Sequence, residues 1–238
     1  MSNYLVKQNL QEKLSLHQDE IQTIATLVQR YRKNTDSELE MRFGCVVQNE
    51  SGKAVFRSGV QKTFFDRCLR NCESYAHWKD VEDWRLSRDI FCNKTRSRTY
   101  FDQDGNEEKT EVIQKRRLKK EDFELGGAAE FTDNPENCRF CLSSESQGRV
   151  EDVYNCSLCK VKLRKCFLTE SGWSFEFSKD WTYQNTEDAA NWMTDEDFVY
   201  NIEIELADRS YLCNQDKHIA SSLLLKSLDF VPGCHVCV

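Results

Sequence analysis

The sequence predicts an α+β fold in which an antiparallel sheet closes into a β-barrel and helices pack against its outside. Segments with apolar and polar alternation recur between residues 38 and 206, and segments with helical spacing lie before, among and after them. The polar faces of these segments carry opposed charges instead of a mild mixture of Ser, Thr and Lys. If the apolar faces pack against helices, the charged faces must line a shared interior.

The composition is typical of one folded domain, which we expect over residues 1–238. The chain has 33 Lys and Arg against 40 Asp and Glu, a formal net charge of -7, and 39% hydrophobic residues, which argues against disorder. No apolar run approaches the ~20 residues that cross a bilayer, and the first residues lack a basic and apolar leader. We therefore expect a soluble intracellular protein. Its acidic balance argues against a broad nucleic-acid footprint, so any such contact must be local.

The elements are predicted in order from the spacing of apolar residues. Helical spacing predicts helices over residues 21–31, 64–72 and 219–228. Period-two alternation predicts strands over residues 38–43, 84–91, 95–101, 111–118, 161–168, 173–181 and 201–206. Asp104-Gly105 predicts a tight turn after the third of these strands. Gly126-Gly127, Pro135 and many Ser and acidic residues predict an irregular, cysteine-containing excursion at about residues 121–160.

The charged faces of the strands contain the candidate site. Two E-x-E pairs, Glu38 with Glu40 and Glu203 with Glu205, lie on one face of the first and last predicted strands. Carboxylates two residues apart on a strand converge on a hard divalent cation, because oxygen ligands suit Mg2+ or Mn2+.

Pairs of cations with the same spacing lie on the strands between the two E-x-E pairs. They are Arg96 with Arg98, Lys115 with Arg117, and Lys162 with Arg164. Such cations suit a polyanion such as a triphosphate. The plainer alternative is a set of ordinary strands with solvated polar faces and cross-strand ion pairs. The presence of both E-x-E pairs together with three cation pairs favours the shared interior.

These segments resemble a known family. Glu38-Leu39-Glu40-Met41-Arg42-Phe43-Gly44 resembles the first signature strand of the metal-dependent RNA 5'-triphosphatases that act in mRNA capping in fungi, protozoa and large DNA viruses, members of the triphosphate tunnel metalloenzymes. Glu203-Ile204-Glu205 resembles their last signature strand, and the segments at 95–98, 113–117, 162–164 and 174–177 follow the family's order. Arg42 favours the capping branch, because the related adenylate cyclase and thiamine-triphosphatase branch usually has Lys there. The resemblance implies a single domain built on an eight-stranded antiparallel β-barrel, the triphosphate tunnel, with flanking helices.

The resemblance also implies an activity and the residues that perform it. Mn2+ or Mg2+ would be held against the γ phosphate by Glu38, Glu40, Glu203 and Glu205, with Arg42 and Glu176 as further catalytic residues. The other phosphate oxygens would be bound by Arg96, Arg98, Lys115, Arg117, Lys162 and Arg164. The implied reaction removes the γ phosphate from the 5'-triphosphate end of nascent mRNA, the first step of cap formation. The implied partners are 5'-triphosphate RNA and an mRNA guanylyltransferase, separate or fused, with no membrane. The implied location is the nucleus, or the cytoplasm or virion for a large DNA virus.

The twelve cysteines suggest a second metal. In a reducing compartment, free thiols or metal ligands are expected instead of disulfides. The pairs Cys138-x2-Cys141 and Cys156-x2-Cys159 have the spacing of a tetrahedral zinc ribbon, which predicts a structural Zn2+ on these four thiols. The alternative is that a cysteine-rich chain forms such pairs by chance, as a further C-x-x-C pair near the C-terminus illustrates.

Two other functions are compatible with the same strands. One is a tunnel-fold phosphohydrolase that acts on small triphosphates or inorganic polyphosphate. The other is a non-catalytic phosphate-binding barrel that docks a phosphorylated partner. The four glutamates argue against the second, because they would repel a phosphate ligand unless a metal bridges them.

Overall fold

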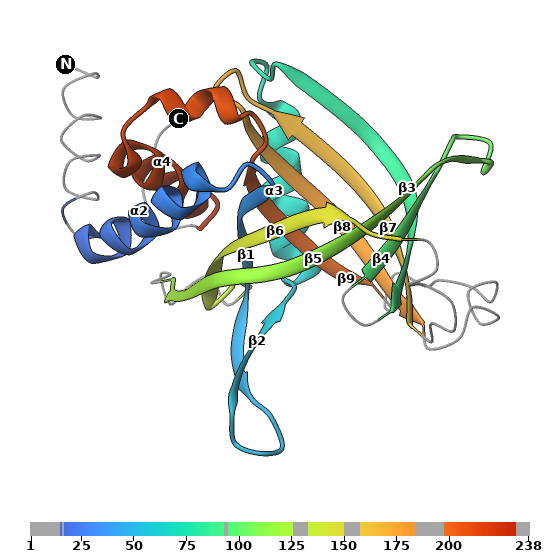
Figure 1. The fold of residues 1–238 in the computed structure, drawn as a ribbon, viewed down its shortest axis with the longest axis horizontal. Coiled ribbons are helices and arrows are strands. Elements are labelled where there is room, and N and C mark those ends of the chain that lie inside the picture. Colours follow the sequence, from blue (N-terminus) through green and yellow to red (C-terminus); the bar gives the residue numbers. More distant parts are fainter. Residues whose placement is uncertain are drawn as a thin grey trace.

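The computed structural model describes residue 15 and residues 17–92, 95–125, 133–149, 158–183 and 198–231 (Figure 1). Within these residues the elements are α2 (Gln18–Lys33), β1 (Ser37–Gln48), β2 (Ala54–Ser58), α3 (Lys62–Ser74), β3 (Asp80–Cys92), β4 (Thr95–Phe101), β5 (Glu107–Glu124), β6 (Asn137–Gln147), β7 (Leu158–Leu168), β8 (Trp173–Tyr183), β9 (Val199–Leu206), the 3-10 helix η4 (Arg209–Cys213) and α4 (Asp216–Leu228). The strands form one sheet in the order β2-β1-β6-β5-β4-β3-β7-β8-β9, and β9 also pairs with β1. The sheet therefore closes into an eight-stranded antiparallel barrel, with β2 outside it.

The outer face of the barrel is apolar and forms the core with the helices. On β1 the alternating residues Leu39, Met41 and Phe43 are no more than 1% exposed, and they belong to one core that includes residues of all three α-helices. Figure 1 shows α2 and α4 side by side at one side of the barrel. This arrangement confirms that the apolar strand faces point outward, so the polar faces point into the barrel.

Helix α2 illustrates how the helices attach to the barrel. Its buried residues include Ile24, Leu27, Val28 and Tyr31, which are spaced for one helical face. The Tyr31 hydroxyl donates a hydrogen bond of 3.2 Å to the carbonyl oxygen of Leu206, at the end of β9. Truncating a side chain in such a core costs about 2–5 kcal/mol. None of the helices in the described ranges is long and apolar enough to span a bilayer.

Strand β2 extends β1 into a hairpin that projects from the barrel (Figure 1). It lies very close to β1 at Gly44, where a Cβ atom would collide with the carbonyl oxygen of Arg57. The same register places Ser58 opposite Gly44, so the end of β2 reaches one mouth of the barrel. This strand was not predicted from the sequence, because its five residues are almost all exposed and therefore show no alternation of buried and exposed positions.

The seven predicted strands and three predicted helices are confirmed, most with a few residues added at their ends. The prediction of an irregular excursion at about residues 121–160 is wrong for residues 137–147, which form the barrel strand β6. Alternation is present there: Phe140 and Leu142 are fully buried in the outer core, whereas Ser143 lines the barrel interior. Ser143 and Glu145, two of the polar residues that suggested a loop, therefore lie on the inner face of a strand.

Candidate active site

The barrel encloses a cavity of about 360 Å3. Every strand of the sheet contributes to its lining, which consists of Glu40, Arg42, Ser58, Asp89, Phe91, Arg96, Arg98, Lys115, Arg117, Cys141, Ser143, Lys160, Lys162, Asp180, Asn201 and Glu203. Seven of these side chains are Lys or Arg and four are Asp or Glu, so the cavity is positively charged although the chain as a whole is acidic. Such a cavity suits an anionic ligand.

The two E-x-E strands lie side by side where the barrel closes. Glu40 is opposite Glu205, and Arg42 is opposite Glu203. The Nη2 atom of Arg42 is 3.0 Å from a Glu40 oxygen and 3.2 Å from a Glu203 oxygen. Burial would lower the pKa of Arg42, but these glutamates raise it further than burial lowers it. The permanent cation of Arg42 therefore bridges a carboxylate of the first barrel strand, β1, and one of the last, β9.

Glu203 and Glu205 lie two residues apart in opposite electrostatic environments. Burial would raise the pKa of Glu203, but Arg42 and Lys162 outweigh this effect and hold it at about 2. Burial raises the pKa of Glu205 to about 8, and the negative charges of neighbouring glutamates add to the increase. In the part of the chain that the structure describes, the Glu205 carboxylate has no hydrogen bond or ion pair. The site therefore lacks positive charge at Glu205.

Lys115, on β5, contacts carboxylates of β1 and of β6. Its Nζ atom lies 2.6 Å from a Glu38 oxygen, 3.5 Å from a Glu40 oxygen and 3.4 Å from a Glu145 oxygen. Burial would lower the pKa of Lys115, but Glu40 and Glu38 raise it, so the amine remains charged. Burial raises the pKa of Glu38, and Lys115 offsets only part of that increase.

Two groups of cations form other parts of the wall. On β7, Lys162 and Arg164 lie 3.5 Å and 3.2 Å from the carboxylate of Glu176 on β8. On β4, Arg98 donates two hydrogen bonds, of 2.6 Å and 2.8 Å, to Asp89 on β3. Burial would raise the pKa of Asp89, but Arg98 lowers it below its ordinary value. β3 and β4 lie across the barrel from β1 and β9, so Arg98 faces the E-x-E strands.

The carboxylates of the site are of the kind that divalent cations prefer, but among the described residues no three carboxylate, imidazole or thiol groups lie close enough together to hold a metal ion. Glu38 and Glu40 direct oxygens toward Lys115 and Arg42 instead, and the charge of Glu205 is left uncompensated. A divalent cation would supply the missing charge, and its preferred ligands are carboxylate oxygens. Mn2+ or Mg2+ at these glutamates remains a prediction.

The twelve residues predicted for catalysis and triphosphate binding all lie on inner faces of barrel strands, and the structure brings them together. Their individual roles remain predictions. Charged or aromatic residues of the site that were not predicted from the sequence include Asp89, Phe91, Glu145, Lys160 and Asp180. Asp89 and Phe91 alternate with outward residues in the predicted strand at 84–91, so the period-two pattern could have identified them. Glu145 lies on β6, which was not predicted.

The three cysteines of the predicted zinc site that lie within the described residues do not converge. Cys138 belongs to the outer core, whereas Cys141 lines the cavity, because residues three apart on a strand point to opposite faces. Cys159 lies on β7, which is separated from β6 by β5, β4 and β3. Cys156 lies outside the described residues. The structure therefore does not support a zinc ion shared by Cys138, Cys141 and Cys159.

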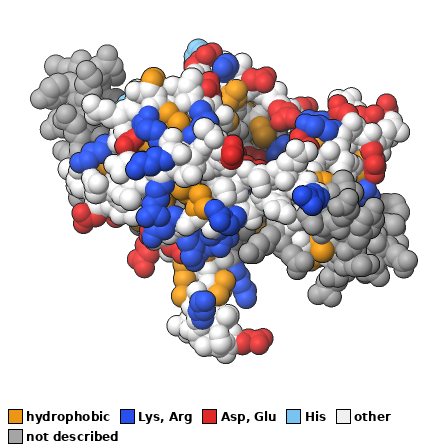
Figure 2. Space-filling view, viewed as in Figure 1, with side chains coloured by type: hydrophobic (Ala, Val, Ile, Leu, Met, Phe, Trp, Pro, Cys, Tyr) orange, Lys and Arg blue, Asp and Glu red, His pale blue; other side chains and the backbone are white. Residues whose placement is uncertain are grey.

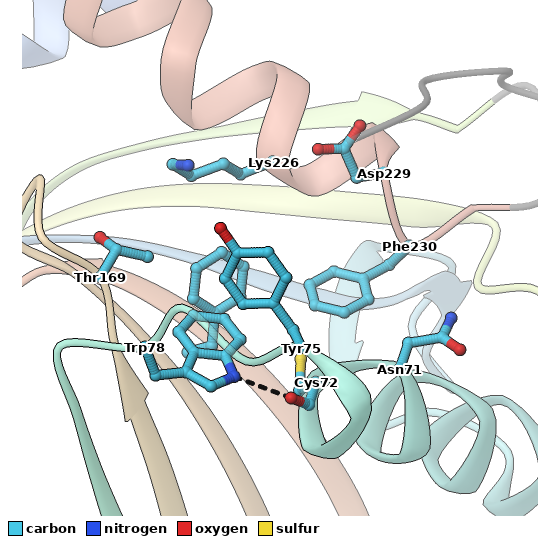
Figure 3. Close-up of a pocket in the computed structure, with 9 residues that line it drawn as sticks. Asn71, Cys72, Tyr75, Trp78, Thr169, Lys226, Asp229 and Phe230 are labelled. Carbon is cyan, nitrogen blue, oxygen red and sulfur yellow. Dashed lines mark hydrogen bonds between the residues drawn. The ribbon is translucent and has the colours of Figure 1, made fainter.

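A second cavity, of about 350 Å3, lies outside the barrel, between α3, α4 and the turn after β7 (Figure 3). Aromatic side chains, including Trp78, Phe175 and Phe230, dominate its walls. Burial lowers the pKa of Lys226, the lysine that lines it. The residues predicted to bind phosphate or metal do not line this cavity, so we assign the candidate chemistry to the barrel interior.

Comparison with solved structures identifies the fold. The structure of S. pombe Pct1 RNA triphosphatase superimposes with a TM-score of 0.59 and 14% sequence identity, over 90% of this chain and 89% of that chain. Pct1 in complex with the Spt5 CTD gives a TM-score of 0.62 and 12% identity, over 90% of this chain and 92% of that chain. The Mimivirus capping enzyme triphosphatase gives a TM-score of 0.58 and 13% identity, over 89% of this chain and 96% of that chain.

No protein-family profile matches the sequence, and comparison with curated protein sequences finds no match. The structural similarity nevertheless extends over nearly the whole chain of each RNA triphosphatase. The fold of this protein is therefore that of these RNA triphosphatases, which confirms the predicted eight-stranded barrel with flanking helices.

Proposed function

We propose that this protein is a divalent-metal-dependent RNA 5'-triphosphatase, which removes the γ phosphate from the 5'-triphosphate end of nascent mRNA in the first step of cap formation. The observation that carries the proposal is the pairing of Glu40 with Glu205 at the closure of a barrel in whose cavity Lys and Arg outnumber Asp and Glu by seven to four. Carboxylates for a metal and cations for phosphate oxygens are the two components that phosphoryl transfer requires. The fold shared with RNA triphosphatases supports the proposal.

The carboxylates of Glu38, Glu40, Glu203 and Glu205 would hold Mn2+ or Mg2+. When bound, the metal would neutralise charge on the transferring phosphoryl group. Arg42 orients two of these carboxylates, because its guanidinium contacts Glu40 and Glu203 together. Its permanent charge also limits the repulsion between the two strands.

The cations of the barrel bind the other phosphate oxygens. Asp89 holds Arg98 by two hydrogen bonds, so the guanidinium plane is fixed before substrate arrives. Glu176 similarly contacts Lys162 and Arg164 and would orient the attacking water through its carboxylate. No covalent intermediate is required, because water would attack the γ phosphorus directly, in line with the bond to the diphosphate end of the RNA that leaves.

The partners and location belong to the same proposal. The Mimivirus triphosphatase is a domain of a trifunctional mRNA capping enzyme. This supports cooperation of the present chain with an mRNA guanylyltransferase, separate or fused. The location that goes with this function is the nucleus in a cellular host, or the cytoplasm or virion for a large DNA virus. The second candidate function is that of a tunnel-fold phosphohydrolase for small triphosphates. The cations of the cavity support it as well, because they would bind the phosphate oxygens of a small triphosphate and of an RNA end alike.

The decisive experiment measures phosphate release from 5'-triphosphate RNA, 5'-diphosphate RNA and tripolyphosphate, with and without Mn2+. We expect metal-dependent release from the triphosphate RNA and little from the diphosphate RNA. Release from tripolyphosphate alone would replace the RNA assignment with the small-substrate one. No metal-dependent release from any substrate would indicate a non-catalytic barrel.

A further inference from the structure

The cavity contains one aromatic side chain among its charged lining. Phe91, near the end of β3, is half-buried, and within the described lining of the cavity it is the sole aromatic ring. Its strand neighbours on the two sides are Arg96 of β4 and Leu158 of β7. A phenyl ring offers nothing to phosphate oxygens, so its presence needs a different explanation from that of the cations around it.

The cavity extends from the E-x-E strands toward one mouth of the barrel. Glu40 and Glu203 line it, whereas Glu38 and Glu205 do not. Because β1 and β9 are antiparallel, increasing residue numbers on β1 and decreasing residue numbers on β9 lead toward the same mouth of the barrel. The cavity therefore begins at one carboxylate of each pair and continues away from the other.

Phe91 lies toward that same mouth. Neighbouring strands of the barrel are antiparallel, and an even number of pairings separates β1 from β3, so these two strands point toward the same mouth. Going from Asp89 to Phe91 on β3 therefore leads toward the same mouth as going from Glu40 to Arg42 on β1. Two residues along a strand correspond to about 6.6 Å. Phe91 is thus one inward-facing position farther from the carboxylates than Asp89, on the side where Ser58 of β2 also reaches the cavity.

The proposed function then determines the direction of the substrate. With its γ phosphate at the carboxylates, a triphosphate must direct its β and α phosphates along the cations of the cavity, toward Lys160 and Arg117. The opposite direction would carry the remaining anionic chain past Glu38 and Glu205, with unfavourable repulsion. The first nucleoside consequently lies at the mouth that contains Phe91.

The surface beyond this mouth suits the rest of an RNA chain. The outer part of β5 continues past Arg117 with Lys119 and Lys120, which are exposed, and Arg116 is exposed beside them. Figure 2 shows Lys and Arg side chains gathered on this side of the molecule, over β5 and β6 and above the projecting β1–β2 hairpin. This local basic surface lies on an otherwise acidic protein and adjoins the mouth at Arg117.

We propose that Phe91 is a specificity-determining residue whose ring stacks against the first nucleoside of the substrate. The inference rests on the proposed function and adds a substrate class to it: the tunnel prefers a nucleoside-bearing triphosphate over inorganic tripolyphosphate. Stacking tolerates any base, because every base has a π face, so the contact suits an enzyme that accepts RNA of different 5' sequences. The phosphate-binding cations serve both substrates, whereas Phe91 serves only the nucleoside.

The test compares KM for triphosphate-ended RNA and for tripolyphosphate in Phe91→Ala, Phe91→Leu and Phe91→Trp. We expect Phe91→Ala to raise KM for RNA by about ten-fold or more, with KM for tripolyphosphate unchanged. Phe91→Leu keeps an apolar side chain without the π face and should resemble Phe91→Ala, whereas Phe91→Trp should retain the preference. Phe101→Ala is the matched control, because Phe101 is a half-buried phenylalanine on β4 that does not line the cavity.

Two outcomes would overturn the inference. Equal increases in KM for both substrates would mean that Phe91 only shapes the cavity, and no change for either would mean that the nucleoside lies elsewhere. A wild-type protein without phosphate release from either substrate would instead refute the proposed function. In that case, calorimetric binding of a triphosphate-ended dinucleotide and of tripolyphosphate to the Glu205→Gln protein still tests Phe91. An identical binding preference with and without Phe91→Ala overturns the stacking contact.

Discussion

Glu40 and Glu205 lie directly opposite each other across the strand pairing that closes the barrel, although 165 positions separate them in the sequence. The pairing places like charges next to each other, which destabilises a sheet unless a cation intervenes. Arg42 supplies one cation on Glu40 and Glu203, and Glu205 is left without one. Closure of the barrel therefore creates the candidate metal site.

Replacing any one of Glu38, Glu40, Glu203 or Glu205 by Gln should abolish Mn2+-dependent phosphate release, because Gln keeps the shape and loses the anion. The reduction should exceed about 100-fold, as expected when a metal ligand is lost. The double variant Glu38→Gln with Glu205→Gln should be scarcely worse than either single one, because members of one site act together. Glu50→Gln, on the exposed β1–β2 turn, is the control. Near-normal rates for the Glu203 and Glu205 variants alone would contradict a shared site.

Adding Mn2+ should raise the melting temperature of the wild-type protein, because a ligand of the folded state stabilises it by mass action. Without metal, Glu205→Gln should be more stable than wild type by about 1–3 kcal/mol, since it removes a poorly paired buried carboxylate. The same variant should lose most of the Mn2+-dependent increase. Thermal unfolding of both proteins, with metal and with chelator, measures these effects. An equal Mn2+ response in the two proteins would place the metal elsewhere.

Replacing Arg96 or Arg164 by Lys should lower kcat/KM by about ten-fold or more, because Lys keeps the charge and loses the planar fork that binds two phosphate oxygens. Arg88→Lys provides the control, since Arg88 does not line the cavity and pairs with Glu107 at 2.9 Å. Steady-state kinetics with triphosphate-ended RNA reports the difference. Full activity of both variants would show that charge alone suffices.

Asp89→Asn should destabilise the protein by about 3 kcal/mol, because it leaves the buried Arg98 guanidinium without its carboxylate. The folded-state pKa of Asp89 is lowered, so its contribution to stability is present above the ordinary value near 4 and is lost as the pH falls through the lower folded value. Wild type should therefore lose stability more steeply than Asp89→Asn below about pH 4. Denaturant unfolding between pH 3 and 7 compares the two, and parallel curves would contradict this account.

Ile24→Asp should lower the free energy of unfolding by at least about 3 kcal/mol, because Ile24 of α2 is fully buried in the outer core. The remaining folded enzyme should keep the metal dependence of wild type, since the helices lie outside the barrel. Urea unfolding and Mn2+ titration of activity check the two parts. A stable variant with altered metal preference would mean that the packing of α2 affects the metal site inside the barrel.

Much of this molecule follows from sequence periodicity alone. Alternation between residues 38 and 43 determines which side chains of β1 point inward, because successive residues on a strand face opposite ways. The same rule places Glu203 and Glu205 on one face of β9 and Lys162 and Arg164 on one face of β7. Helical spacing in α2 likewise identifies the face that Ile24 buries. These are local properties, which each segment carries wherever it lies.

Contacts between distant segments were decided only by the tertiary structure. The register that sets Glu40 opposite Glu205 depends on barrel closure, and the pairing of Asp89 with Arg98 depends on the register of β3 and β4. Strand β6 was not predicted because both faces of its second half are polar, so the segment shows no apolar alternation there, and only its pairing with β1 and β5 makes it a strand. The spacing of Cys138 and Cys141 suggested a zinc site, but their strand directs the two thiols to opposite faces. The physical reason is that spacing along a chain determines direction only once the segment is known to be a strand, whereas proximity between strands depends on how the whole sheet curves and closes.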